Sequence, residues 1–66
     1  MNAKDQQKVL EAGFTIIRAD FTNLRIKEKT IHSIDGWCTF EKGFASKAAV
    51  IRRMKALLTD SQIIED

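Results

Sequence analysis

The chain of 66 residues has no proline, no tyrosine, one cysteine and one histidine, and it lacks any long apolar run. The single cysteine excludes an internal disulfide, and Cys38 with His32 cannot complete a four-ligand zinc site. A membrane span needs roughly 18 consecutive apolar residues, and the N-terminus lacks the charged-then-apolar pattern of a secretion signal. We therefore expect a cytoplasmic protein that enters no membrane and holds no metal or cofactor.

Residue combinations typical of catalysis are also missing. The sequence contains no carboxylate pair, glycine-rich phosphate loop or nucleophile constellation. Cys38 and His32 come nearest to a nucleophile and base, because a tight hairpin would place residues 32 and 33 opposite residues 39 and 38. Nothing supplies a pocket for them, and a cysteine in such a strand is typically a small buried hydrophobe. We expect a protein that is not an enzyme.

The charges are distributed unevenly along the chain. Residues 14–58 hold nine lysines and arginines against four acidic residues, a balance of +5. The last eight residues carry −3, from Asp60, Glu65 and Asp66. A basic body with an acidic tail is compatible with binding a polyanion, and equally with pairing of a basic patch with an acidic protein surface.

The clearest periodic segment spans residues 46–58, where Ser46 is a good N-cap for a helix. Five apolar residues fall within about 120° of one another on this helix and predict one buried face. They are Val50, Ile51, Met54, Leu57 and Leu58. Lys47 lies toward the same side in the first turn, and the cations at 52, 53 and 55 point outward or flank it. These cations fit either a solvated helix face or contacts with phosphates.

The rest of the chain predicts a short helix followed by strands. Asn2 can cap a helix over about residues 3–12, which Gly13 ends with Phe14 folding back onto Val9. Residues 15–21, 24–30 and 37–44 alternate apolar and polar side chains. The prediction is one α+β domain, residues 1–66, with a helix, a three-stranded antiparallel sheet and a long C-terminal helix packed on one sheet face (αβββα). Residues 59–66 form either an extended tail or an edge strand.

Two details decide which residues the sheet exposes. In the first strand Ile17, Ala19 and Phe21 face inward, because burying Arg18 on the other face would be costly. The local sequence favours a two-residue turn at Asp35 and Gly36. That turn would put the lysines at 27 and 29 on the same face as the apolar residues at 38 and 40, and such a face cannot form one core. A bulge or a longer loop between about residues 29 and 36 would shift the pairing by one residue and place positions 24 and 26 with 38 and 40.

We predict this shift. The outer face then carries cations around an aromatic side chain, namely Arg18, Arg25, Lys27, Lys29, Trp37 and Thr39. Without the shift, Trp37 becomes part of the core.

Residues 37–40, with 44–49, place a strand, a phenylalanine and a serine-lysine helix start in order. Over roughly residues 24–58 the chain resembles the arm-binding N-terminal domain of phage-type tyrosine recombinases and the plant ethylene-response-type DNA-binding domain. In those families the exposed sheet face enters the major groove, so the resemblance implies DNA contacts by Arg25, Lys27, Lys29, Trp37 and Thr39. The leading helix departs from that pattern and is similar to the order of a double-stranded-RNA-binding domain, whose lysine cluster is present here only as Lys47.

We therefore expect a small nucleic-acid-binding module whose cations neutralise phosphates while Trp37 or arginine side chains stack on bases or read base edges. The ligand is DNA or RNA. The residues expected to contact it are Arg18, Arg25, Lys27, Lys29, Trp37, Thr39, Lys47 and Arg52.

The alternative is an interaction protein encoded by a phage or mobile element, because the chain is also similar to very small proteins of unknown function from those sources. Such a protein would inhibit or modulate a host nuclease or defence complex, so its partner would be a host protein or ribonucleoprotein. It would use the basic patch or Ile63 and Ile64, since paired isoleucines in a terminal segment either pack on their own domain or form a dimer or partner contact. Both a monomer and a homodimer fit the sequence.

Overall fold

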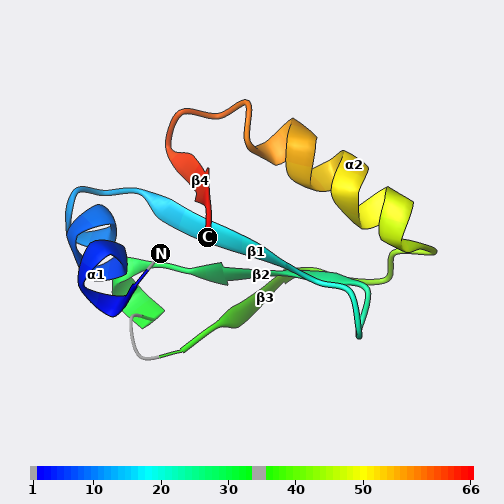
Figure 1. Ribbon diagram of the computed structural model, residues 1–66, viewed down its shortest axis with the longest axis horizontal. Helices are drawn as coiled ribbons and strands as arrows, with labels where there is room; N and C mark the ends of the chain where they lie inside the picture. The colour runs from blue at the N-terminus through cyan, green and yellow to red at the C-terminus, as the bar shows by residue number, and fades with distance from the viewer. Residues whose placement is uncertain (1, 34–35) are drawn as a thin grey trace.

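The computed structural model describes residues 2–33 and 36–66 and has an α+β fold (Figure 1). Its elements are α1 (Ala3–Glu11), β1 (Thr15–Asp20), β2 (Arg25–Lys29), the 3-10 helix η1 (Ile31–Ser33), β3 (Cys38–Glu41), α2 (Lys47–Leu57) and β4 (Ile63–Glu65). The sheet has four strands in the order β3-β2-β1-β4. β2 pairs antiparallel with β1 and β3, whereas β4 pairs parallel with β1. The prediction of an antiparallel sheet of three strands is therefore wrong, because a fourth strand makes the sheet mixed.

β4 comes from the segment for which the sequence allowed a tail or an edge strand. The N–H of Thr15 donates to the carbonyl of Gln62 at 2.9 Å, and the N–H of Asp66 donates to the carbonyl of Ile17 at 3.0 Å. Ile63 packs against the main core. An antiparallel β1–β2–β3 sheet leaves one edge of β1 unpaired, and β4 covers the first half of that edge.

Local sequence accounts for both ends of α1. The Oδ1 atom of Asn2 accepts a hydrogen bond from the N–H of Asp5 at 2.9 Å, as expected of an N-cap. At the other end Gly13 has a φ of +96°, and the N–H of Phe14 donates to the carbonyl of Val9 at 3.2 Å. This is the predicted Schellman ending, which needs a residue that tolerates positive φ. Within the described ranges neither α1 nor α2 is long and apolar enough to cross a membrane.

α2 covers one face of the sheet and forms the main core with it. Ser46 caps the helix through its Oγ atom, which accepts from the N–H of Ala49 at 3.2 Å. Val50 and Met54 then bury themselves against Ile17 and Ile26, with Leu57 and Leu58 half-buried at the margin. The sequence prediction of a helix packed on one sheet face is confirmed in this part of the molecule.

Two apolar residues predicted to face this core are instead exposed. Ile51 is 44% exposed and Phe21 is 41% exposed. α2 meets the sheet along a stripe through Val50 and Met54, and Ile51 is turned by about 100° from Val50 around the helix axis. Ile51 and Phe21 therefore line a hollow at the edge of the sheet, and the prediction that they lie in the core is wrong.

The pairing of β2 with β3 places Lys27 opposite Thr39 and Glu28 opposite Cys38, so Lys27 and Thr39 share a face, as the shifted register predicts. A separate irregularity, which was not predicted, lies between Ile26 and Lys27 and puts Ile26 opposite Glu41. The connection contains η1 and is longer than a two-residue turn, although Asp35 of the predicted turn lies outside the described residues. The irregularity leaves Phe40 as the extra residue of a bulge.

Phe40 and Cys38 differ from the prediction that placed them with the core. Phe40 is 38% exposed, and Cys38 is exposed and lies opposite Glu28. α2 packs against β1 and β2, so it does not extend over this edge of the sheet. An inward register alone does not bury a side chain where no helix covers it.

A second, smaller core lies on the opposite face. Ile16 is fully buried although it points away from Ile17, which belongs to the α2 core. α1 packs against β1 and contributes Leu10, which is 1% exposed. With Ile17 facing inward, alternation along the strand would have put Ile16 on the outer face beside Arg18, and nothing in the sequence indicated that α1 covers this end.

Candidate nucleic-acid interface

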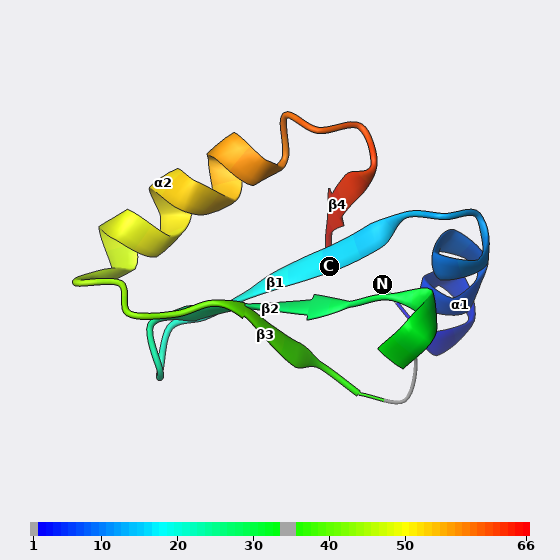
Figure 2. The same cartoon turned by 180° about the vertical axis from the view of Figure 1, so that it is seen from behind.

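The sheet face opposite α2 carries the cations of β1 and β2. Because side chains alternate along a strand, residues next to Ile17 and Ile26 point to the face that α2 does not cover. In both views α2 lies on one side of the sheet, and α1 lies at the end remote from the β1–β2 turn (Figures 1 and 2). We call the part of this face that α1 leaves uncovered the basic face. It is defined as Arg18, Arg25, Lys27, Lys29, Trp37 and Thr39. The structure brings together these six residues, which the shifted register predicted.

Lys27 lies in the middle of the basic face. It is opposite Arg18 on one side and Thr39 on the other. Like charges directly opposite on antiparallel strands repel each other and destabilise a sheet. Within the described part of the chain, the Lys27 ammonium makes no hydrogen bond or ion pair. The cost of this arrangement to folding makes Lys27 a candidate for a role in binding an anion.

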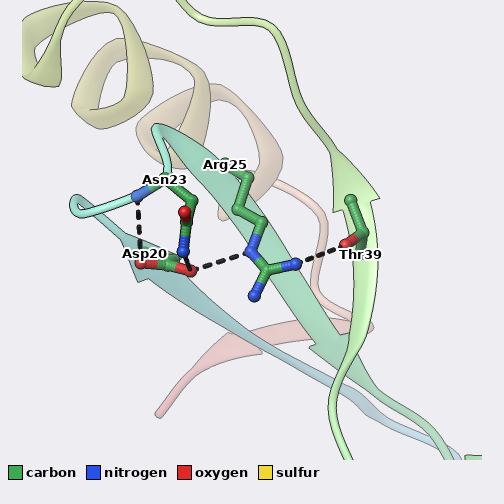
Figure 3. A network of polar contacts seen from close by, with 4 residues as sticks. All are labelled: Asp20, Asn23, Arg25 and Thr39. Atoms are coloured by element: carbon green, nitrogen blue, oxygen red, sulfur yellow. Dashed lines mark hydrogen bonds and ion pairs between the residues drawn. The ribbon is translucent and has the colours of Figure 1, made fainter.

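Arg25 is held from two sides on the same face (Figure 3). Its Nε donates to Oδ2 of Asp20 at 2.8 Å, and its Nη1 donates to Oγ1 of Thr39 at 2.9 Å. Asn23 donates to the same carboxylate through Nδ2 at 3.0 Å and through its backbone N–H at 3.3 Å. These contacts orient the guanidinium across β1, β2 and β3 before any ligand binds, which lowers the entropic cost of binding.

The hydrogen-bond network stabilises the ionised form of the Asp20 carboxylate. Hydrogen bonds from Asn23 and then from Arg25 hold the pKa of Asp20 well below its usual range. Asp20 therefore neutralises part of the charge of Arg25 while fixing its direction. Nη2 of Arg25 makes no hydrogen bond within the described residues, so the free corner of the guanidinium can donate to a ligand.

Trp37 lies half-buried beside two cations. The Cζ atom of Arg18 is 5.5 Å from the centroid of the Trp37 ring, and the Nζ atom of Lys29 is 5.1 Å from it. Both distances fall within the roughly 6 Å reach of a cation–π contact. Trp37 thus belongs to the outer face, as the shifted register predicts, and is not a core residue.

The end of the basic face near α1 is tied down by polar contacts. Nζ of Lys29 donates to Oε1 of Gln6 at 3.1 Å, and Nε2 of Gln6 donates to Oδ1 of Asp66 at 3.0 Å. Nε of Arg18 lies 3.9 Å from Oδ2 of Asp66. Among the described residues, the four cations of the face are therefore opposed by two carboxylates, Asp20 and Asp66, which leaves a formal balance of +2.

Two cations predicted to contact nucleic acid lie elsewhere. Lys47 begins α2 and Arg52 lies in its middle, so both belong to the layer on the other side of the sheet. Both side chains are exposed. The structure does not join them to the basic face, because α2 packs against the sheet face that the basic face turns away from. One continuous surface made of all eight predicted residues is therefore not formed.

The other candidate residues are also placed by the structure. Ile63 packs against the main core, and Ile64 lies opposite Ile16 in the sheet, so both are half-buried within the fold. His32 lies in η1, and Cys38 lies opposite Glu28. The hairpin pairing that would have aligned residues 32 and 33 with 39 and 38 is not formed.

Sequence reasoning missed the residues that position the cations. Asp20 and Asn23 flank the β1–β2 turn, and an Asp three residues before an Asn in a turn is a local signal for side-chain to backbone bonding. Gln6 and Asp66 are 60 residues apart in the chain and meet only in the folded state. No local pattern could have linked that pair to Lys29.

Comparisons with protein-family models, with curated proteins and with solved structures found no match to this chain. The resemblance to recombinase arm-binding domains stays a prediction, and the basic face is defined by its own residues and geometry.

Proposed function

We propose that the protein binds nucleic acid through the basic face. The observation that carries this proposal is the row formed by Arg18, Lys27 and Thr39 across three strands, in which two cations lie directly opposite each other. Phosphate oxygens spaced along a backbone would relieve this repulsion, and Arg25 is already oriented to donate a hydrogen bond beside it.

Antiparallel strands can enter a nucleic-acid groove. A two-stranded β-ribbon fits the major groove of B-DNA, and here β1, β2 and β3 present one cationic surface. The predicted resemblance to DNA-binding sheets points the same way. Lys27 and Arg18 would contact phosphates, while Arg25 and Trp37 would meet base edges or base faces. A cytoplasmic location accompanies this proposal as an expectation from the sequence.

Intrinsic fluorescence provides the first test, because Trp37 is the only tryptophan and the chain has no tyrosine. Duplex DNA, duplex RNA and single strands are titrated between about 50 and 200 mM salt. We expect saturable quenching whose affinity falls with salt, with a logarithmic slope of roughly −0.9 for each phosphate contacted. A flat signal together with no mobility shift of the nucleic acid would contradict the proposal.

Two variants localise the binding surface. Lys27→Ala should lower affinity roughly three- to tenfold and reduce the salt slope by about one. Arg52→Ala removes an exposed cation from α2 and is the matched control, for which we expect unchanged affinity. If Arg52→Ala lowers the affinity and Lys27→Ala does not, nucleic acid binds to α2 and not to the basic face. An interaction protein of a phage or mobile element, the alternative from the sequence, would bind naked nucleic acid weakly and would recover a host protein or ribonucleoprotein in pull-downs.

A further inference from the structure

β4 pairs with only the first half of β1. The carbonyl of Ile17 accepts from the N–H of Asp66, and within the described residues strand pairing on this side goes no further. Backbone groups alternate in direction along a strand, so the N–H and carbonyl of Ala19 point to the same edge as those of Ile17. No strand of the described chain lies opposite Ala19 there. This unpaired edge is a template for an additional strand.

An apolar hollow of about 270 Å³ opens beside that edge. It is lined by Ala19, Phe21, Ile51, Met54, Lys55, Leu58 and Glu65. Two of the large exposed hydrophobic side chains of the protein, Phe21 and Ile51, belong to its wall. Most of the side chains that line the hollow are apolar, so it can receive one large apolar side chain.

Two lysines of α2 flank Ile51, and one of them, Lys55, belongs to the lining of the hollow together with Glu65. Side chains three or four residues apart on a helix lie in one row. Such a row runs along α2 and its C-terminal end and consists of Lys47, Ile51, Lys55 and Leu58. α2 contains no acidic residue, and Glu41 pairs with Arg53, which points to a different side of the helix. Glu65 is the one carboxylate in the lining of the hollow. The two lysines lie one turn before and one turn after Ile51, and both are exposed.

We propose that this site, formed by the edge of β1 at Ala19 and the hollow beside Ile51, binds an extended acidic peptide segment of a partner protein. The segment adds as a strand along Ala19, places one large apolar side chain in the hollow, and directs acidic side chains to Lys55 and Lys47. Main-chain hydrogen bonds to Ala19 supply affinity in this mode of recognition, and the hollow supplies selectivity. The site lies across the sheet from the basic face and does not depend on it.

The test uses a library of random octapeptides displayed on phage and selected on the full chain. We expect enrichment of peptides in which large apolar residues alternate with aspartate or glutamate. A selected peptide, made synthetically with a fluorophore, should bind Ile51→Asp at least tenfold more weakly than the parent chain. Ile31→Asp is the matched control, because Ile31 is also 44% exposed but lies in η1. Enrichment of no such peptides, or equal binding to Ile51→Asp, would overturn the proposal.

Charge and backbone contacts are tested separately. Lys55→Glu should weaken the acidic peptide roughly three- to tenfold, whereas Lys4→Glu reverses an exposed charge on α1 and should not. Hydrogen exchange of the Ala19 amide should be fast in the free protein and slow in the complex. Binding without protection of Ala19 would overturn strand addition. If an oligonucleotide, and not the peptide, protects the Ala19 amide from exchange, this edge binds nucleic acid. The proposal of a peptide partner would then be wrong.

Discussion

The two faces of the sheet are stabilised by different forces. On the α2 side, Ile17, Ile26, Val50 and Met54 exclude water from one apolar cluster. On the basic face, only the end beneath α1 is apolar, and the rest is ordered by hydrogen bonds and cation–π contacts at its margins. The comparison teaches that one face holds the fold together while the other keeps cations in defined positions at some cost to stability.

The largest effect expected from this comparison is on the α2 side. Ile26→Ala removes a fully buried side chain and should lower the free energy of unfolding by about 3 kcal/mol, because it loses apolar burial and leaves a cavity. A domain of this size has little stability to spare, so the variant should be largely unfolded at modest urea concentration. Urea denaturation followed by Trp37 fluorescence measures the change.

Ile51→Ala is the matched control on the same layer. Its side chain is 44% exposed, so truncation should cost well under about 1 kcal/mol. Equal losses for the two variants would mean that α2 buries Ile51 in solution, and the distinction between core and hollow would fail.

An intermediate effect is expected for two carboxylates, one on each face. Hydrogen bonds from Asn23 and Arg25 lower the pKa of Asp20, and a bidentate contact from Arg53, with distances of 2.8 and 2.9 Å, lowers the pKa of Glu41. The same contact raises the pKa of Arg53. A carboxyl group whose pKa is lower in the folded state stabilises the fold above its ordinary pKa, and this contribution is lost as pH falls through the lowered value.

Thermal unfolding from neutral pH down to about pH 2 measures this dependence. The midpoint should fall on the acid side, and Asp20→Asn should flatten that fall more than Glu41→Gln, since the shift at Asp20 is the larger one. Glu28→Gln controls for loss of a strand carboxylate outside both networks. An acid limb that neither Asp20→Asn nor Glu41→Gln alters would remove both pairs as its cause.

The smallest effect is on the basic face. Lys27→Thr removes the repulsion with Arg18 and inserts a residue that favours strands, so the free energy of unfolding should rise by about 0.5 kcal/mol. The same variant should bind nucleic acid more weakly. A gain in stability with a loss of affinity would be the signature of a residue kept for binding. If both the free energy of unfolding and the affinity fall, Lys27 instead stabilises the fold, through packing of its aliphatic stem.

The sequence predicted well those features that depend on near neighbours. Asn2, Gly13 and Ser46 act as helix ends through contacts within a few residues of each position. Alternation in β1 and β2 identified the cations of the basic face for the same reason. The shift of register was also within reach, because only one pairing avoids putting lysines into the core.

Features that depend on contacts between distant segments were left open or were not predicted. The sequence allowed residues 59–66 to be a tail or an edge strand, and their parallel pairing with β1 is encoded by no local pattern. Cys38 and Phe40 are exposed because α2 packs on β1 and β2 and leaves that edge of the sheet uncovered. Ile16 is buried because α1 packs against β1 at that end. Lys47 and Arg52 were grouped with the sheet cations by charge alone, although the sheet separates them.

The sequence by itself therefore determined the helix ends, the alternation of the strands and the identity of the cations, since each follows from spacing along the chain. Only the tertiary structure decided the fourth strand, the site of the bulge, the bonds that fix Arg25 between Asp20 and Thr39, and the hollow beside Ile51. The physical reason is that burial and hydrogen bonding depend on which segments meet in space, and these segments lie far apart in the chain.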